Sequence, residues 1–260
     1  MSEDAIFIDK SGPHAVLRLN RPDKRNALNL GMWRRMIDLL DEAAADPSVR
    51  LLIVTGAGQA FAAGADITEM EAVFEDPAIA KTIAEVTYDA QKVLHRFPKP
   101  TIAMIRGACV GGGCGIALCC DLRFADTTAK LGITPGKLGL VYSLADTKRL
   151  IDAVGPARAK DILYTGRILT AEDALSAGLL NRLVEPDDLE RTVTAFADDI
   201  CKASQFSAEA TKKIAGMILD GAADDTPETR QLFIDSFSGD DFHEGFTAFK
   251  EKRTPDFGKT

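Results

Sequence analysis

Three consecutive glycines, Gly111 to Gly113, stand between a strand-like and a helix-like segment and constrain the fold more than any other feature. Residues 101–106 alternate in a way that favours a β-strand, whereas residues 111–121 are mostly small or apolar and contain no proline. Glycine inside a helix costs about 1 kcal/mol relative to alanine, so glycines at a helix start indicate backbone that approaches another group closely. That group is either a closely packed strand or a ligand oxygen that carries or gains negative charge.

A second glycine-bearing loop favours the ligand. Residues 51–55 form an apolar strand-like run, and the loop after them reaches Gly64 and Ala65 before Asp66, a good N-cap for a helix that starts at Ile67. The chain therefore contains two strand–loop–helix units that each present backbone N–H groups. If the amides of Ala65 and Gly112 converge on one carbonyl oxygen, they form an oxyanion hole, in which each donor stabilises an enolate or tetrahedral anion by roughly 3–4 kcal/mol.

The composition excludes several classes of protein. With 260 residues, of which 46% are hydrophobic, the chain can bury a sizeable core. A net charge of −8 argues against nucleic acid as a partner. No apolar run approaches the length of about 18 residues that a membrane span needs, and the acidic start of the chain lacks the apolar region of a secretory signal. We therefore expect a cytoplasmic protein with no membrane partner.

The five cysteines are expected to fill the core. Cys109, Cys114, Cys119 and Cys120 lie close to the glycine run, whereas Cys201 stands apart. Spacings of five residues turn by about 140° per step on a helix, so these thiols do not share one helix face. We expect small buried side chains and no metal site, because cysteine is among the most buried residue types.

Strand and helix signals alternate over the first 185 residues and then change. Strand-like segments separated by helical ones recur at least three times, which predicts an α/β fold of stacked ββα turns, although an open doubly wound sheet has the same pattern. From residue 186 strand signals almost vanish, and four segments have helical spacing, namely 187–203, 207–219, 227–237 and 241–253. The predicted organisation is a core of residues 1–185 that holds the site and a C-terminal helical region of residues 186–260.

Four motifs, in this order, resemble those of the crotonase (enoyl-CoA hydratase/isomerase) family. They are NRPDKRNAL at 20–28, FAAGADI at 61–67, GACVGGG at 107–113 and EGFTAFKEKR at 244–253. The resemblance extends over nearly the whole chain, from about residue 6 to residue 257. It implies a crotonase-like spiral of ββα turns with a C-terminal helical subdomain. It also implies an acyl-CoA thioester as substrate, no further cofactor, and an oxyanion hole made by Ala65 and Gly112.

The resemblance further implies contacts with CoA and an oligomer. The polar loop at residues 21–26 would lie along the nucleotide end of CoA. The Phe-rich C-terminus would help to cover the adenine of a neighbouring subunit in a homotrimer or a dimer of trimers. The substrate- and CoA-binding positions matched in this way are Lys24, Arg25, Ala27, Gly64, Asp66, Ile67, Thr68, Phe233, Phe249 and Lys252.

Two acid–base residues of the family's hydratases are missing. The positions that match their glutamates are Gly115 and Pro135, and neither side chain can transfer a proton. Ordinary two-glutamate hydration is therefore not implied, whereas the oxyanion hole is. Substitutes have to come from nearby polar residues, and the candidates are Tyr142, Asp146, Glu69 and Glu71.

Tyr142 is of particular interest because residues 134–142 resemble the matching segment of methylmalonyl-CoA decarboxylase relatives, in which a tyrosine faces the substrate carboxylate. This tyrosine is therefore a candidate catalytic residue.

The sequence leaves three hypotheses for the function. The first is an enzyme of hydratase/isomerase type with relocated acid–base groups or with bound water or bicarbonate in their place. The second is a decarboxylase of a malonyl-type CoA ester, which needs the oxyanion hole but no base to remove a carbon-bound proton. The third is a non-catalytic acyl-CoA-binding protein.

Overall fold

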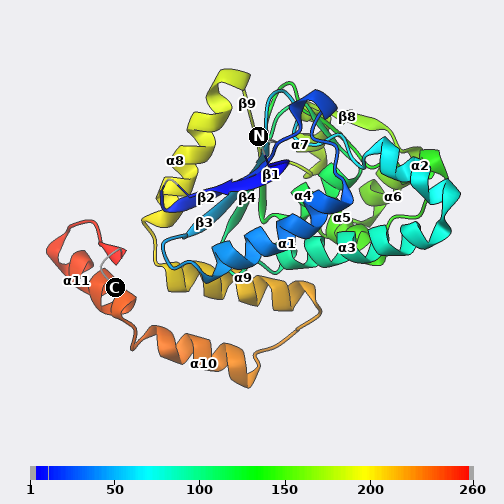
Figure 1. The fold of residues 1–260 in the computed structure, drawn as a ribbon. Helices are drawn as coiled ribbons and strands as arrows, with labels where there is room; N and C mark the ends of the chain where they lie inside the picture. The colour runs from blue at the N-terminus through cyan, green and yellow to red at the C-terminus, as the bar shows by residue number, and fades with distance from the viewer. Residues whose placement is uncertain (1–3, 11, 258–260) are drawn as a thin grey trace.

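The computed structural model describes residues 4–10 and 12–257 (Figure 1). Within these residues the main sheet has six strands, which are β1 (Ile6–Asp9), β2 (His14–Leu19), β3 (Leu51–Gly56), β4 (Thr101–Ile105), β6 (Leu122–Asp126) and β9 (Arg182–Val184). They lie in the order β1-β2-β3-β4-β6-β9. The β1–β2 pair is antiparallel and the other pairs of this sheet are parallel.

A smaller sheet completes the spiral. Its strands in the described part of the chain are β5 (Ala108–Val110), β7 (Lys130–Gly132) and β8 (Ile168–Thr170), in the order β5-β7-β8. From β4 to β7 consecutive strands alternate between the two sheets, since β4 and β6 belong to the large sheet and β5 and β7 to the small one. The predicted ββα spiral is confirmed, and a single open doubly wound sheet is excluded.

Helices cover both faces of the main sheet. The helices of the described residues are α1 (Leu30–Ala45), α2 (Ile67–Glu75), α3 (Pro77–His95), α4 (Gly112–Cys119), α5 (Leu144–Val154), α6 (Pro156–Thr165), α7 (Ala171–Ala177), α8 (Leu189–Cys201), α9 (Gln205–Leu219), α10 (Pro227–Ser236) and α11 (Asp240–Glu251). Three short 3-10 helices are η1 (Pro22–Lys24), η2 (Pro135–Leu138) and η3 (Pro186–Asp188). No helix in the part of the chain described here is long and apolar enough to cross a bilayer.

Strand β3 is buried on both faces, as expected for a central parallel strand. Leu52 and Val54 belong to the larger hydrophobic cluster, which also includes residues of α1, α3 and α4. Leu51 and Ile53 point to the opposite face and pack in the cluster that contains Leu189 of α8. Figure 1 shows α8 on one side of the sheet and α1 with α3 on the other. Helix α8 therefore contributes to the core, although it follows residue 185.

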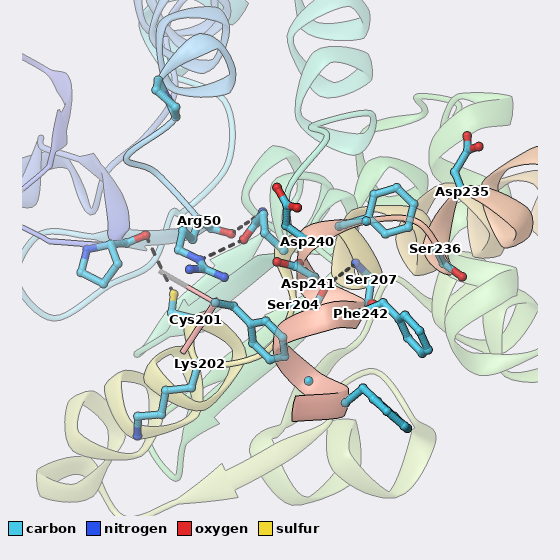
Figure 2. Close-up of a pocket in the computed structure, with 18 of the residues that line it drawn as sticks. Arg50, Cys201, Lys202, Ser204, Ser207, Asp235, Ser236, Asp240, Asp241 and Phe242 are labelled. Atoms are coloured by element: carbon cyan, nitrogen blue, oxygen red, sulfur yellow. Dashed lines mark hydrogen bonds between the residues drawn. The ribbon is translucent and has the colours of Figure 1, made fainter. Parts of the chain in front are cut away.

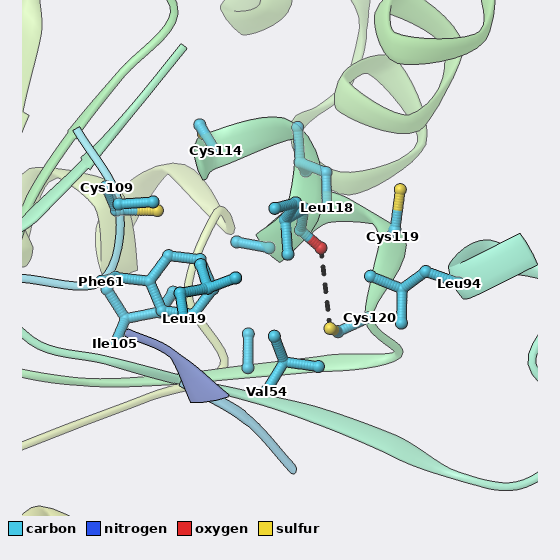
Figure 3. Packing of buried hydrophobic residues seen from close by; sticks show 14 of the residues in the cluster. Leu19, Val54, Phe61, Leu94, Ile105, Cys109, Cys114, Leu118, Cys119 and Cys120 are labelled. Atoms are coloured by element: carbon cyan, nitrogen blue, oxygen red, sulfur yellow. Dashed lines mark hydrogen bonds between the residues drawn. The ribbon is translucent and has the colours of Figure 1, made fainter. Parts of the chain in front are cut away.

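Helix α4 is almost entirely buried, and its cysteines pack among apolar side chains of the core (Figure 3). Cys109, Cys114, Cys119 and Cys120 are all buried, which confirms their predicted role as core residues. Burial raises the pKa of the Cys119 thiol to about 12, so this group stays protonated at neutral pH. A protonated, enclosed thiol is neither a good nucleophile nor a metal ligand.

The C-terminal helices α10 and α11 extend away from the sheets (Figure 1). Their aromatic side chains remain accessible, with Phe233 68% exposed and Phe249 83% exposed. An aromatic ring contributes a large apolar area when it is buried, so this surface is typical of an interface. The prediction that the Phe-rich segment meets another subunit is thus compatible with its exposure and remains a prediction.

Candidate active site

Two backbone segments that are distant in sequence run side by side at the centre of the candidate site. The Ala62 amide donates to the Ala108 carbonyl at 2.9 Å, and the Val110 amide donates to the Ala62 carbonyl at 2.9 Å. A Cβ added to Gly64 would stand 3.2 Å from the Val110 carbonyl oxygen. A Cβ added to Gly111 would stand 3.7 Å from the Gly64 Cα. The two glycine segments are therefore in backbone contact, and the residues that follow them, Ala65 and Gly112, are neighbours.

The backbone conformation at residues 64 and 111 also requires glycine. Gly64 has φ +108° and Gly111 has φ +54°, a region in which a Cβ is strained. These turns direct the chain out of one strand and into the start of α2 or α4. The structure thus contains the two predicted strand–loop–helix units, and their glycine turns are in contact.

The amides of Ala65 and Gly112 have no acceptor among residues 4–10 and 12–257. Leu28 pairs with this loop, because its N–H donates to Gly64 O at 2.8 Å and its carbonyl accepts from Asp66 N at 2.9 Å. In such a pairing the N–H of the intervening residue, Ala65, points away from Leu28. Gly112 is the first residue of α4, where the N–H groups have no intrahelical acceptor and the helix dipole favours negative charge. The arrangement can bind an oxygen that becomes negative.

The third glycine has a packing role. A Cβ on Gly113 would lie within 2.8 Å of the Ala62 Cβ and still closer to the Ala62 carbonyl oxygen. A Cβ on Gly112 would make ordinary contacts at 3.4 Å with Leu28 and Trp33. Close packing and a ligand oxygen were alternative explanations of the glycine run. In the structure, packing accounts for Gly113, whereas the unused amide belongs to Gly112.

The polar loop at residues 21–27 is held against the same centre. Buried Asn26 accepts from the Arg21 amide at 2.9 Å and donates to the Ala60 carbonyl at 2.7 Å. The Arg25 carbonyl accepts from Ala63 N at 2.9 Å, and the Arg21 guanidinium donates to the Ala27 carbonyl at 2.8 Å. The side chains of Lys24 and Arg25 are exposed beside the Gly64 loop, where they could contact a phosphate.

Of the predicted positions at the start of α2, Asp66 has structural partners of its own. Asp66 caps α2 through Thr68 N and forms an ion pair with Arg21 at 2.7 Å. The hydrogen bond from Arg21 lowers the pKa of the Asp66 carboxyl. Ile67 and Thr68 are exposed at the start of α2, next to Ala65. Asp66 therefore shapes the loop, and its exposed neighbours have free surface for a ligand.

Glu69 and Glu71, two candidate substitutes for the missing acids, differ in their surroundings. Both oxygens of the Glu69 carboxylate accept from the Leu30 amide, at 2.9 and 2.8 Å, so this residue caps the start of α1. Glu71 is exposed on α2. The structure gives Glu69 a structural partner and does not bring Glu71 to Gly115.

The position of the first missing glutamate is surrounded by polar atoms from two other helices and the loop before α5. A Cβ added to Gly115 would stand 2.5 Å from Gln91 Nε2, 3.5 Å from the Tyr142 hydroxyl and 3.6 Å from Asp146 Oδ1. Gln91 lies on α3, Tyr142 precedes α5, and Asp146 lies in its first turn. Tyr142 and Asp146, predicted as substitutes, are thus brought to Gly115. The sequence analysis missed Gln91, which no motif marks.

A hydrogen-bonded chain links these groups. Arg149 Nη2 donates to Asp146 Oδ1 at 2.8 Å and to Gln91 Oε1 at 3.0 Å. The Ser143 hydroxyl donates to Asp146 Oδ2 at 2.7 Å. Both oxygens of Asp146 are therefore engaged, and this carboxylate holds Arg149 in place.

The Tyr142 hydroxyl, unlike the Asp146 carboxylate, is not engaged by any described side chain. It is buried without a hydrogen-bond partner among the described residues. Burial, followed by the charges of Cys114 and Asp146, raises the pKa of Tyr142 well above its usual value. The phenol therefore remains protonated at neutral pH and can donate a hydrogen bond to a substrate group.

The second missing glutamate position, Pro135, is the first residue of η2. Its carbonyl accepts from Leu140 N at 2.9 Å and stabilises the turn that leads to Tyr142. A proline ring offers no proton, so this segment acts through the position that it gives to Tyr142.

The C-terminal candidates lie far from this centre within one chain. Phe233 on α10, and Phe249 with Lys252 at the end of α11, are at the opposite end of the molecule from α2 (Figure 1). They can contribute to a CoA site only through another subunit.

A large cavity of roughly 1200 Å³ also lies away from the candidate site (Figure 2). It separates α11 from α8 and the start of α9, and its lining includes Arg50, Cys201, Ser204 and Phe242. Of the residues singled out by the sequence, Cys201 and two residues of the 244–253 motif, Gly245 and Phe246, line it. Among the described residues, no three or more His, Cys, Asp or Glu side chains are grouped as a metal site.

The two sheets, between which the strands β4 to β7 alternate, and the two glycine segments in backbone contact define a crotonase-fold protein. The family model for enoyl-CoA hydratase/isomerase matches residues 10–260. The chain is 45% identical to an enoyl-CoA hydratase/isomerase family protein from Hyphomonas neptunium, whose crystal structure agrees with a TM-score of 0.94 over 97% of each chain. The protein described here belongs to the enoyl-CoA hydratase/isomerase family.

Curated relatives cover the same length. The chain is 34% identical over 262 residues to the crotonyl-CoA hydratase of Syntrophomonas wolfei, with 99% of each chain covered. It is 34% identical over 258 residues to the 2,3-dehydroadipyl-CoA hydratase of Escherichia coli K12, again with 99% of each covered. The expected family and fold are therefore confirmed.

Proposed function

We propose that this protein is a lyase or isomerase that acts on an acyl-CoA thioester and stabilises its enolate with the amides of Ala65 and Gly112. The contact between Gly64 and Gly111 carries this proposal, because it makes neighbours of two amides that have no acceptor in the described part of the chain. Donors placed in advance around a developing oxyanion each lower the barrier by roughly 3–4 kcal/mol. CoA is part of the substrate, and Lys24 and Arg25 beside the Gly64 loop are proposed to contact its phosphates.

Ordinary hydration is the less favoured reaction at this site. Adding water to an enoyl thioester requires a base for the water and an acid for Cα, which each typically contribute about 10²–10⁴-fold. Gly115 and Pro135 supply neither group, and Asp146 is engaged with Arg149 and Ser143. Hydration by this protein is therefore expected to be slow.

Decarboxylation of a malonyl-type CoA ester is the second candidate, and the Tyr142 hydroxyl favours it. That hydroxyl is buried, has no hydrogen-bond partner among the described residues and lies 3.5 Å from the point where a Cβ of Gly115 would stand. In this reaction the bond from Cα to the carboxylate breaks, its electron pair forms the enolate, and CO₂ leaves. Cα then takes a proton from water or from Tyr142. No base is required, so the missing glutamates do not prevent the reaction.

Three measurements on one preparation separate these possibilities. They are the loss of enoyl absorbance from crotonyl-CoA, the release of CO₂ from malonyl-CoA and methylmalonyl-CoA, and the thermal shift caused by acetyl-CoA. Hydration near a typical turnover of about 10 s⁻¹ would contradict slow hydration. Release of CO₂ supports the decarboxylase, and acyl-CoA binding without either reaction favours a non-catalytic binding protein. No thermal shift at millimolar acetyl-CoA would contradict acyl-CoA as the ligand.

The assembly proposed with this function is a cytoplasmic homotrimer or dimer of trimers. The exposed aromatic surface of α10 and α11 supports it, since most of Phe233 and Phe249 remains exposed among the described residues. Light scattering gives the mass in solution, and a monomeric mass would exclude this assembly.

A further inference from the structure

Gln91 is held in one orientation next to Gly115. Its side chain is only 4% exposed, and its Oε1 accepts from Arg149 Nη2 at 3.0 Å. A guanidinium has donors and no acceptor, so the amide oxygen must face Arg149 and the amide nitrogen must face the other way. The amide nitrogen faces Gly115, because Nε2 lies 2.5 Å from the point where a Cβ of residue 115 would stand.

Arg149 is itself fixed, so the orientation of Gln91 is not free to reverse. The same Nη2 that holds Gln91 donates to Asp146 Oδ1 at 2.8 Å, and the Arg149 side chain is nearly buried. Turning the Gln91 amide over would place two donors face to face inside the protein, where an unpaired polar group is costly. Gln91 Nε2 donates to no acceptor among the residues described, whereas Oε1 is held by Arg149.

The groups that face Gly115 are predominantly donors. Gln91 Nε2 offers N–H groups, and the protonated Tyr142 hydroxyl lies 3.5 Å from the same point. The acceptor in this cluster, Asp146, is engaged by Arg149 and Ser143. Donors without a free acceptor suit a group that only accepts hydrogen bonds, and an ionised carboxylate is such a group.

The distance from the oxyanion-binding amide limits the length of the ligand. Gly115 follows Gly112 by three residues, which corresponds to about 4.5 Å along the axis of α4. A carboxylate near Gly115 would therefore belong to a short diacid that is attached to CoA at its other end.

We propose that Gln91 is a specificity-determining residue that donates a hydrogen bond to a carboxylate on the acyl group, and that Arg149 is the positioning residue that orients it. The ligand class is the CoA monothioester of a short dicarboxylic acid, of malonyl or succinyl length. This inference rests on the proposed function, because it requires a thioester oxygen between Ala65 and Gly112.

Titration calorimetry with two esters of equal chain length tests the inference. Succinyl-CoA carries the carboxylate, and butyryl-CoA has a methyl group in its place. The unmodified protein is expected to bind succinyl-CoA at least tenfold more tightly than butyryl-CoA. Gln91→Glu keeps an acceptor for Arg149 but replaces the donor with negative charge, so it should abolish this preference and leave butyryl-CoA binding within about twofold.

Two further variants control for structural effects. Gln91→Leu removes the donor without adding charge and should reduce the preference for succinyl-CoA by about tenfold. Gln231→Leu changes an exposed glutamine on α10, which bonds to Asp235, and should leave both affinities unchanged. Melting temperatures and butyryl-CoA binding report whether each variant is folded.

The outcomes separate this inference from the proposed function. If butyryl-CoA binds and succinyl-CoA is not preferred, or if Gln91→Glu keeps the preference, the carboxylate inference is overturned and acyl-CoA binding stands. If neither ester binds to the unmodified protein, the proposed function fails and the inference fails with it.

Discussion

Gln91 Nε2 lies 2.5 Å from the place that a Cβ on Gly115 would occupy, so the glutamine on α3 fills the space of the glutamate that the family's hydratases carry on α4. A side chain at residue 115 requires the Gln91 amide to move, because real Cβ atoms essentially never approach another atom so closely. In the observed arrangement the amide of Gln91 therefore stands where the side chain of an acid at residue 115 would begin.

The close approach of Gln91 to Gly115 predicts which substitutions restore hydration. Gly115→Glu with Pro135→Glu supplies both carboxylates, and Gln91→Ala makes room for the first of them. The triple variant is expected to hydrate crotonyl-CoA at least about 100-fold faster than the parent, since each positioned acid or base contributes about 10²–10⁴-fold. The rate is read from the loss of enoyl absorbance. A triple variant with Gly115→Gln, which has similar volume but no acid, should remain slow, and equal rates in the two would refute this explanation.

Tyr142→Phe tests the role of the unpartnered hydroxyl. The change removes one oxygen and little volume, so acetyl-CoA affinity should stay within about twofold. Any decarboxylation of a malonyl-type ester should fall by roughly tenfold or more, because the loss of one good hydrogen bond to a charged group corresponds to about 1.5–3 kcal/mol. CO₂ release and calorimetry on the same samples give both values. Tyr164→Phe, at an exposed tyrosine on α6, is the matched control. An undiminished CO₂ release rate would remove Tyr142 from the mechanism.

Replacing two helical glycines by alanine distinguishes the cost of a steric contact from the gain in helix propensity. Gly113→Ala should destabilise the protein by about 1–3 kcal/mol, because the new methyl group meets the Ala62 backbone. Gly216→Ala, in the middle of α9 with nothing within 4 Å, should be neutral or stabilising by up to about 1 kcal/mol. Urea unfolding of the two variants and the parent measures the difference. Equal effects would show that contact with Ala62 is not the cause.

The ion pair between Asp66 and Arg21 predicts a pH dependence of stability. Hydrogen bonding by Arg21 lowers the folded-state pKa of Asp66 below the unfolded value of about 3.9. Its contribution is therefore complete above the unfolded pKa and is lost as the pH falls through the folded pKa. Asp66→Asn should cost about 1–2 kcal/mol at pH 7 and progressively less in acid.

Unfolding in urea between pH 7 and pH 2 gives this difference directly. Asp76→Asn is the control, since Asp76 caps α3 through Ala78 N but forms no ion pair among the described residues. A difference for Asp66→Asn that persists below the folded pKa would mean that the carboxylate charge is not responsible.

The sequence alone determined the two glycine segments and, through its four motifs, the family and the spiral that the family implies, whereas the alternation of strands and helices left an open doubly wound sheet possible. The glycine segments are local features, because the positive φ of Gly64 and Gly111 and the close approach at Gly113 each demand a glycine at a defined place in the chain. The short strands β5, β8 and β9 were not predicted individually, since three residues are too few for an alternating pattern to be recognised.

Only the tertiary structure decided what surrounds the missing glutamates. Glu69 was a plausible acid by sequence, and its contact with Leu30 on another helix makes it a cap. Gln91 had no signal at all, because one polar residue on an amphipathic helix has the same pattern whether it meets water or an active site. It reaches Gly115 through Arg149, which is 58 residues further along the chain and is brought to it by the packing of α3, α4 and α5. Such a contact depends on side-chain directions across three helices, and no local preference of the chain encodes it.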